Sequence, residues 1–202
     1  MITNRVRARM EARAILYDTN FRTEVYEEDE LTWEQHNEIH RALNIAYHFR
    51  TQSFVKKTFG YCLPIKRVLA YYDDKLVGHI AVFIDHIFVD GERVKIAGLG
   101  MSLSLKPMSL LGGVLRRTAL NICAQQGFDF ALGRIRNNMR TREHMASFVW
   151  CFLELPLIGK TTRSHEDEIV AVFDTKRFRQ CPDWLISQAC KQGFIKIEDE
   201  IF

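Results

Sequence analysis

The run LVGHIAVFIDHIFVDGERVKIAGLGMSLSL, Leu76 to Leu105, decides how this chain folds. It holds two stretches rich in β-branched and aromatic residues on either side of Asp90-Gly91, a dipeptide typical of tight turns between antiparallel strands. A similar stretch, RVLAYY, precedes it, and the turn Asp73-Asp74-Lys75 joins the two. We therefore expect a three-stranded antiparallel meander of long, mostly buried strands. The expected strands are Arg67–Tyr72, Leu76–Val89 and Val94–Leu105.

A turn and an amphipathic helix follow the meander. The helix is expected from Val114 to Gln126, and Gly127 marks its end, because glycine readily adopts the left-handed conformation that closes helices. Phe128 to Leu132 is short and apolar, which predicts a central strand parallel to the third meander strand, since a helical crossover joins the two. Asn137 to Phe152 is expected to form another helix.

The flanking segments extend the pattern in both directions. Thr32 and Gln35 have the spacing of a capping box, and the helix that they open, Trp33 to Phe49, has apolar residues at helical spacing. Those apolar residues are Ile39, Leu43 and Ala46. The other expected elements are an edge strand at Phe21–Glu30, helices at Phe49–Phe59 and Pro182–Gln192, and strands at Ile169–Phe173 and Phe194–Ile201. We expect one α/β domain over residues 21–202, preceded by a basic N-terminal extension over residues 1–20.

Composition limits the class of protein. The 202 residues, 47% of them apolar, are enough for one sizeable core. The net charge of +3 does not indicate nucleic-acid binding, and no apolar run is long enough for a transmembrane helix. The five cysteines are scattered and odd in number, which favours neither a disulfide framework nor a zinc site. We expect a protein of the reducing cytoplasm that needs no metal.

The order of elements, a long meander followed by a loop, a helix, a short strand and another helix, resembles the Gcn5-related N-acetyltransferase fold. Within it, Val77 to Gly100 is similar to the same stretch of the aminoglycoside 2'-N-acetyltransferases and of the rhizobial nodulation-factor N-acyltransferases, which share Val77, His79 and the turn near Asp90. The nodulation-factor family also has equivalents of several further motifs. They are Ala97-x-Leu99-Gly100, the G-x-x-R of Gly133 and Arg136, the strand Asp167–Phe173 and the tryptophan segment Pro182–Trp184, so the similarity covers residues 67–190.

This resemblance implies a mixed, mostly antiparallel sheet flanked by helices, and an N-acyltransferase function. Such an enzyme moves an acyl group from the thioester of acetyl-CoA, of a longer acyl-CoA or of an acyl carrier protein to a primary amine, such as that of an amino sugar. A non-catalytic binding or regulatory module of the same fold is the alternative. The sequence indicates no oligomeric state.

In these families a loop of the form [RQ]-x-x-G-x-[GA] binds the pyrophosphate of coenzyme A through its backbone amides. Its counterpart here is SLLGGV, which keeps Gly112 but has Ser109 and Val114 at the other two defining positions. The resemblance therefore assigns the donor to the end of the third meander strand and the start of the following helix. The donor-binding residues that it implies are Met101, Ser102, Leu103, Ser104, Leu105, Leu111, Gly112, Gly113, Val114, Leu115, Arg116 and Asn138.

The acid and base that this fold usually carries are missing from their aligned positions. The base positions hold Gly98 and Gly100, which have no side chain to accept a proton. The helix that usually supplies a tyrosine as the acid offers Phe148, Trp150 and Cys151 instead. Direct attack of an amine on a thioester depends mainly on positioning and on a donor to the developing oxyanion, so the reaction does not require these two groups.

Replacements for the missing groups can be named. His86, Asp85 and His144 are the candidate catalytic side chains, and the backbone of Ser102 or of Met101 is the candidate oxyanion donor. His79 is interpreted as a packing or hydrogen-bonding residue. The remaining candidates, Cys123 and Cys151, lie on expected apolar helix faces and are interpreted as buried thiols.

Arginines are frequent near the implied phosphate end of the donor site. Guanidinium groups could bind the phosphates of coenzyme A or the acidic helix of an acyl carrier protein, and a solvated face is the alternative. An RNA-binding role would need interleaved aromatic motifs, which the sequence lacks. The arginines are Arg116, Arg117, Arg134, Arg136, Arg140 and Arg142.

Overall fold

The structure is a computed structural model, and it divides into two compact units. One unit is Met1–Ala81 with Met101–Ala119, and the other is Val82–Gly100 with Leu120–Phe202. The residues that the structure describes are 17–47, 63–89, 91–105, 110–128, 130–146, 149–155, 157–158, 168–175, 191 and 194–197.

The predicted meander is confirmed, and its strands lie close to their expected bounds. They are β2 (Lys66–Tyr72), β3 (Lys75–Val89) and β4 (Glu92–Ser104). Asp73 and Asp74 both have positive φ, 49° and 57°, as in the two-residue turns whose twist matches that of antiparallel strands. The edge strand β1 (Phe21–Tyr26) pairs antiparallel with β2, from Phe21 opposite Tyr72 to Tyr26 opposite Arg67.

The expected first strand, Phe21 to Glu30, is too long. The chain leaves the sheet after Tyr26 and forms the short 3-10 helix η1 (Glu28–Glu30). The N–H of Glu27 donates to the carboxylate of Glu30 at 2.8 Å and closes a capping box. The local hydrogen bonds of this acidic segment therefore replace further pairing with β2.

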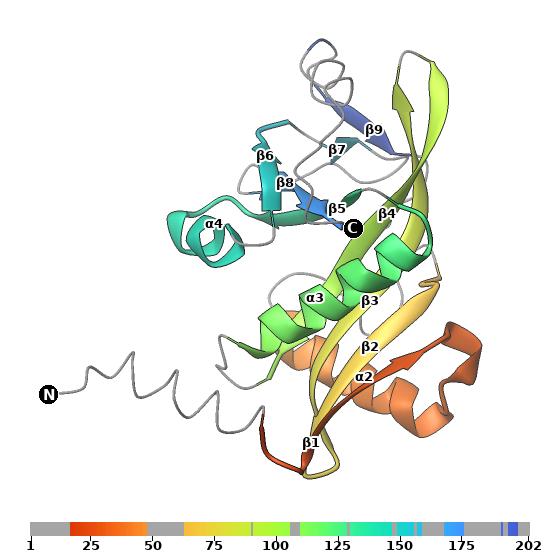
Figure 1. Ribbon diagram of the computed structural model, residues 1–202, viewed down its shortest axis with the longest axis vertical. Coiled ribbons are helices and arrows are strands. Elements are labelled where there is room, and N and C mark those ends of the chain that lie inside the picture. The colour runs from red at the N-terminus through yellow and green to blue at the C-terminus, as the bar shows by residue number, and fades with distance from the viewer. Residues whose placement is uncertain are drawn as a thin grey trace, which may run out of the picture. The chain divides into compact units, whose positions relative to one another are not determined.

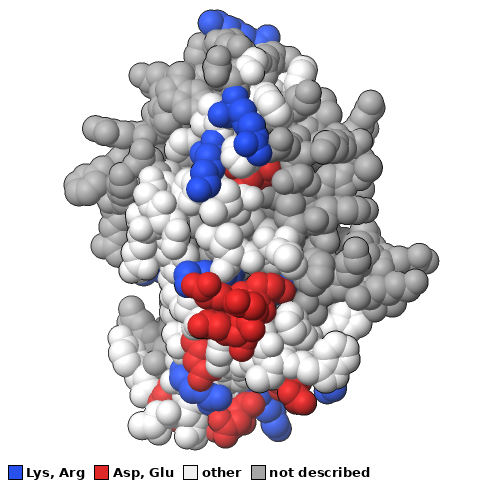
Figure 2. Space-filling view, turned by 90° about the vertical axis from the view of Figure 1, so that its right-hand side faces the viewer, with Lys and Arg blue, Asp and Glu red and all other residues white. Residues whose placement is uncertain are grey.

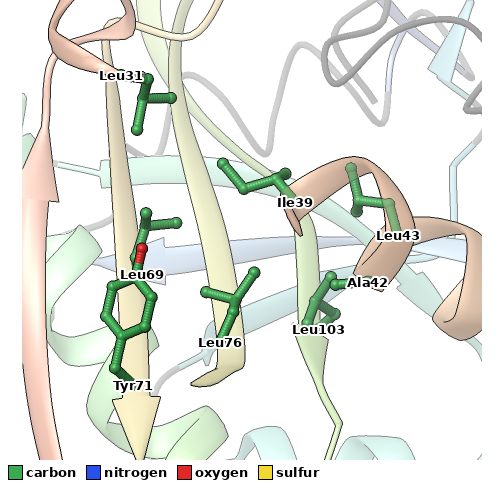
Figure 3. Packing of buried hydrophobic residues seen from close by; sticks show 8 residues of the cluster. All are labelled: Leu31, Ile39, Ala42, Leu43, Leu69, Tyr71, Leu76 and Leu103. Carbon is green, nitrogen blue, oxygen red and sulfur yellow. The ribbon is translucent and has the colours of Figure 1, made fainter. Parts of the chain in front are cut away.

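Helix α2 (Trp33–Tyr47) begins at the predicted capping box. The N–H of Gln35 donates to the hydroxyl of Thr32 at 3.2 Å, and the N–H of Thr32 donates to the amide oxygen of Gln35 at 2.9 Å. Ala46 is exposed, against expectation, and Ala42 is buried instead. Figure 3 shows this core, in which the helix packs on β2, β3 and β4. Its members are Leu31, Ile39, Ala42, Leu43, Leu69, Tyr71, Leu76 and Leu103.

Helix α3 (Leu111–Gln125) begins three residues earlier than expected, so Gly112 and Gly113 lie in its first turn rather than in a loop. In Figure 1 the helix passes in front of β3, while α2 lies behind β2. The predicted end is confirmed: Gly127 has φ 84°, and the N–H of Phe128 donates to the carbonyl of Cys123 at 3.0 Å. This bond satisfies a carbonyl that the end of the helix would otherwise leave without a partner.

In the second unit, β5 (Phe130–Arg136) pairs parallel to β4, as predicted, with Ala131 opposite Ala97. Strand β8 (Glu168–Asp174) pairs antiparallel with β5, and β6 (Val149–Leu153) pairs antiparallel with β8. Two short strands, β7 (Leu157–Ile158) and β9 (Ile195–Ile197), pair with each other, and β9 also pairs with β3. The core of this unit contains Ile87, Ile96, Leu132, Leu153, Val170, Val172 and Ile195.

The expected helix from Asn137 to Phe152 is wrong in its second half. Helix α4 spans only Met139–Met145, and the chain then forms strand β6. The sequence VWCFL is rich in β-branched and aromatic residues, and β8 supplies a pairing edge that only the folded sheet offers. Cys151 therefore lies on a strand opposite Val172 and not on a helix.

The sheet order is β1-β2-β3-β4-β5-β8-β6, and its only parallel pairs among the described strands are β4 with β5 and β7 with β9. The predicted fold class, a mixed and mostly antiparallel sheet flanked by helices, is confirmed. The expected helices at Phe49–Phe59 and Pro182–Gln192 lie outside the described residues. Among the described helices, none is both long and apolar enough to cross a membrane.

Candidate functional site

Three consecutive residues of β3 hold three parts of the implied donor site. The carbonyl of Val77 accepts a hydrogen bond from the N–H of Leu105, just past the end of β4, at 2.9 Å. Gly78 lies under the start of α3, and the ring of His79 contacts the carbonyl of Met101 at 2.8 Å. The end of β4 and the start of α3 are therefore fixed to one short segment of β3.

Gly78 allows α3 to approach the strand closely. A Cβ atom at this position would lie 2.8 Å from Cδ1 of Leu115 and 3.2 Å from Cδ2 of Leu111, and both leucines are fully buried. Any larger residue would therefore push the first turns of the helix away from β3. The side chains of these two leucines belong to the core, so only their backbone could contact a ligand.

The first turn of α3 presents backbone N–H groups. The N–H of Val114 already donates to the carbonyl of Leu110 at 3.0 Å, so the amides without a partner inside the helix are those of Leu111, Gly112 and Gly113. The turn contains no acidic side chain, and the helix dipole favours an anion at this end. Burial lowers the pKa of the nearby Arg116 to about 10, whereas Arg117 is exposed.

Met101 has an unusual backbone conformation near the end of β4. Its φ is 51°, in the left-handed region that residues with a side chain rarely adopt. Such a residue costs about 1–2 kcal/mol and persists only when its surroundings fix it. A strand residue of this kind redirects the backbone locally, as β-bulges do. Of the neighbouring residues, Ser102 is half-buried, Leu103 points into the core, and Ser104 is exposed.

The His79 ring that bonds to the Met101 carbonyl has a defined protonation state. Nε2 lies 3.1 Å from Nη1 of Arg67, and because a guanidinium can only donate, Nε2 must be the acceptor. The ring proton is therefore on Nδ1, which donates to the Met101 carbonyl. Burial, and then the charge of Arg67, lower the pKa of His79 to about 3, so the ring is neutral at physiological pH.

Arg67 is itself fully buried and is fixed by Glu28 of η1. Its Nε lies 2.5 Å from Oε2 of Glu28 and its Nη2 lies 2.9 Å from Oε1, a bidentate pair. Lys66 also reaches this segment and pairs with Glu27 at 2.8 Å. Acidic side chains gather on the side of the molecule that includes η1 (Figure 2). A continuous chain of hydrogen bonds thus runs from Glu28 through Arg67 and His79 to Met101.

The candidate catalytic side chains lie in the second unit, whereas Ser102 lies in the first. Asp85 and His86 are adjacent in β3, so they point to opposite faces of the strand. The carboxylate of Asp85 is buried and accepts from the backbone N–H of His86 at 2.6 Å, and the His86 ring is half-buried. His144 lies in α4, but its side chain is outside the described residues.

Asn138 and two of the arginines have structural partners in the second unit. The side chain of Asn138 accepts from the N–H of Thr141 at 2.9 Å and caps α4. Arg142 pairs with Glu154 at 2.6 Å, and Arg134 lies 3.5 Å from Glu168. Arg136 is exposed, and the Arg140 side chain lies outside the described residues.

Gly133, the glycine of the G-x-x-R motif, has a packing role. A Cβ atom there would lie 3.0 Å from the carbonyl oxygen of Leu99 and 3.0 Å from Cε2 of Phe173. Because glycine has no Cβ atom, β5 can lie close to the neighbouring strands.

The two described cysteines have different surroundings. Burial raises the pKa of Cys123 to about 12, as expected for a core thiol, and Cys151 is half-buried beside the core of the second unit. In the part of the chain that the structure describes, no three His, Cys, Asp or Glu side chains group in a way that could hold a metal ion.

Glu28 and Arg67 are the site residues that the sequence analysis missed. The available signal was an arginine inside the otherwise apolar strand RVLAYY, where a buried charge requires a partner. The identity of that partner could not be read, because Glu28 lies 39 positions away in the sequence.

Comparisons with known proteins agree with this fold. The family model described as nodulation protein A (NodA) matches residues 18–177. An acyl-CoA N-acyltransferase from Pseudomonas aeruginosa is 13% identical with a TM-score of 0.54, and ElaA from Escherichia coli is 11% identical with a TM-score of 0.52. Each match covers 76% of this chain and 99% of the other.

Another similar structure is much longer. The chain spans 33% of a probable N-acyltransferase from Enterococcus faecalis, to which it is 14% identical over 68% of its own length with a TM-score of 0.47. The comparison with curated proteins finds no match. At these identities the solved structures establish the fold, and the family model establishes the family. The matched residues include β1, the whole meander and α3, so the chain belongs to the nodulation protein A (NodA) family, whose members are acyltransferases of the Gcn5-related fold.

Proposed function

We propose that this acyltransferase takes its acyl group from a pantetheine thioester, carried by coenzyme A or by an acyl carrier protein, and passes it to the primary amine of a small acceptor such as an amino sugar. The observation that supports this most is the common anchoring of the β4 end and the α3 start by Val77, Gly78 and His79. These are the two elements that the family resemblance assigns to the donor.

The residues at the start of α3 fit a phosphate group. Gly112 and Gly113 have no side chain to cover their amides, and the first turn has no acidic residue. The N–H groups of Leu111, Gly112 and Gly113 would hold the phosphate end, and residues 101–105 would hold the pantetheine. Because the amide of Val114 is already bonded within the helix, the binding turn is shorter than the family motif suggests.

The thioester supplies an activated acyl group when it is bound. The backbone N–H of Met101 or Ser102 would orient the carbonyl and stabilise the negative charge that develops on its oxygen. His79 is not the base, because both of its ring nitrogens are engaged and its pKa is about 3. The group that accepts the proton of the attacking amine stays a prediction, with His86, Asp85 and His144 as the candidates.

The experiment that tests this proposal is a donor and acceptor matrix. The purified protein is incubated with acetyl-CoA, palmitoyl-CoA or palmitoyl acyl carrier protein, each with amino sugars, polyamines and aminoglycosides, and acylated products are identified by mass spectrometry. The same acceptors with their amines acetylated in advance are the control. We expect amide products that require a free amine. No amide product from any pair, with a folded protein, would overturn the proposal.

We also propose that the protein works in the cytoplasm. Cys123 and Cys151 are both thiols, which is the usual state of cysteines in a reducing compartment. Alkylation in intact cells, followed by peptide mass spectrometry, should find both residues reduced, and an oxidised fraction as large as that of secreted proteins would contradict this location.

A further inference from the structure

We infer that Glu28, Arg67 and His79 act as positioning residues that set the backbone of Met101 for the acyl thioester. None of the three is proposed to touch the substrate. The inference rests on the proposed function, because the thioester is the group that the Met101 backbone would orient.

The first step is the bond between His79 and Met101. A left-handed residue inside a strand is unfavourable, and a directional hydrogen bond to its carbonyl selects one orientation of the flanking peptide groups. The donor is a ring in a packed interior rather than a flexible side chain, because His79 is fully buried. The position of the Met101 carbonyl, and with it the direction of the N–H groups on either side, is therefore set by the ring.

The second step is the control of the ring by Arg67. A guanidinium always donates, so Nε2 has to accept and the proton has to stay on Nδ1. The alternative tautomer would place a lone pair of Nδ1 against the Met101 carbonyl and lose the bond. A lysine could not replace Arg67, because one ammonium group cannot both grip the Glu28 carboxylate in bidentate fashion and reach the ring.

The third step is the role of Glu28. It is the carboxylate that pairs with the buried Arg67, and its side chain is only 16% exposed. Its place in η1 is fixed by the capping box between Glu27 and Glu30. The chain of contacts therefore begins in a short helix outside the sheet and ends at Met101 inside β4.

If Glu28, Arg67 and His79 served stability alone, apolar side chains could take their place. Well-packed apolar residues often match or exceed the stability of a buried ion pair, so a chain of two buried polar side chains and a mostly buried carboxylate is a poor way to gain stability alone. What the chain adds is a single permitted geometry at Met101. Activity and stability should therefore respond differently when individual bonds are removed.

Two substitutions of the same residue separate the bonds. His79→Asn places an amide N–H where Nδ1 was and can still donate to Met101, but it is too short to reach Arg67. His79→Gln can accept from Arg67 but no longer donates to Met101. We expect His79→Gln to lower kcat by about tenfold to a hundredfold with little change in the donor KM, and His79→Asn to retain most of kcat, at similar melting temperatures.

The rate of amide hydrogen exchange at residues 101–104 reports on the Met101 backbone and can be measured without turnover. Exchange there should be faster in His79→Gln than in the wild-type protein and in His79→Asn. If the wild-type protein makes no amide product, the proposed function fails, whereas unchanged exchange in His79→Gln overturns the positioning inference whether or not there is turnover. Equal kcat in both variants, or losses that follow melting temperature alone, would also overturn it.

Discussion

Nδ1 of His79 lies 2.8 Å from the carbonyl oxygen of Met101, a residue whose φ of 51° places it in the left-handed region. The residue before His79 supports α3, and the residue before that bonds to Leu105. The sequence Val-Gly-His in β3 therefore contacts both the end of β4 and the start of α3, the two elements of the candidate donor site. Its three members act by a backbone carbonyl, by the absence of a side chain and by a buried ring.

Replacing Gly78 should displace the start of α3. Gly78→Val adds atoms where even a Cβ would lie 2.8 Å from Leu115, so we expect a loss of about 1–3 kcal/mol in unfolding free energy and weaker donor binding. Lys75→Val is the control, because Lys75 lies in the same strand as Gly78 and is exposed. Urea denaturation and calorimetric titration with acetyl-CoA measure both effects. Equal stability of the two variants would contradict the packing described for α3.

The buried His79 should make stability depend on pH. Its pKa is about 3 in the folded protein, below its ordinary value of 6.5, so below pH 6.5 the unfolded chain takes up a proton that the folded protein does not. This contribution is fully present above pH 6.5 and is lost progressively as the pH falls toward 3, by about 1.4 kcal/mol per pH unit. Between pH 7 and pH 5 the wild-type protein should therefore lose about 2 kcal/mol more than His79→Asn.

Urea denaturation of both proteins at pH 7, 6 and 5 checks this difference. The other titrating groups are common to the two proteins, so their contributions cancel in the comparison. Parallel dependence on pH would mean that His79 can take up a proton in the folded state.

Glu28 and Arg67 should be strongly coupled. Arg67→Met leaves the Glu28 carboxylate without its partner, and Glu28→Gln leaves a buried guanidinium without its counter-charge, so we expect each to destabilise by about 3–5 kcal/mol. The double variant should lose clearly less than the sum of the two, because it removes both charges. A double-mutant cycle by urea denaturation measures the difference. Additive losses would show that the two side chains do not depend on each other.

Cys123 should be protected from alkylation in the folded protein. Burial raises its pKa to about 12, so little thiolate forms near neutral pH, and it should react with iodoacetamide only when the protein unfolds. Cys151 is half-buried and should react sooner. Peptide mass spectrometry after timed labelling compares the two. Faster labelling of Cys123 than of Cys151 would contradict the described core.

The parts of the fold that could be predicted are those that depend on local chemistry. The meander follows from β-branched residues and turn dipeptides, the start of α2 from Thr32 and Gln35, and the end of α3 from Gly127. Strand β6 could not be predicted, because its identity depends on the edge that β8 offers. Its sequence alone also suits a buried helix.

The candidate site was only partly readable for a similar reason. The family resemblance indicated the β4 end and the α3 start, but the support of Met101 depends on Glu28, which is 39 positions before Arg67. The left-handed backbone of a methionine leaves no trace in the sequence, since only glycine or asparagine would have indicated it. His79 was correctly interpreted as a hydrogen-bonding residue, yet its partners and tautomer come only from the structure.

Calorimetric titration of the wild-type protein and of Gly112→Trp with acetyl-CoA and palmitoyl-CoA tests whether the start of α3 binds the donor. A tryptophan in the first turn of α3 would cover the amides proposed to bind the phosphate end, so we predict measurable binding by the wild-type protein and at least about a tenfold weaker affinity in the variant, at a similar melting temperature. Gln125→Trp, which adds the same side chain at an exposed position near the other end of the same helix, is the matched control. Equal affinity of Gly112→Trp and the wild-type protein would contradict the assignment of the donor to β4 and α3.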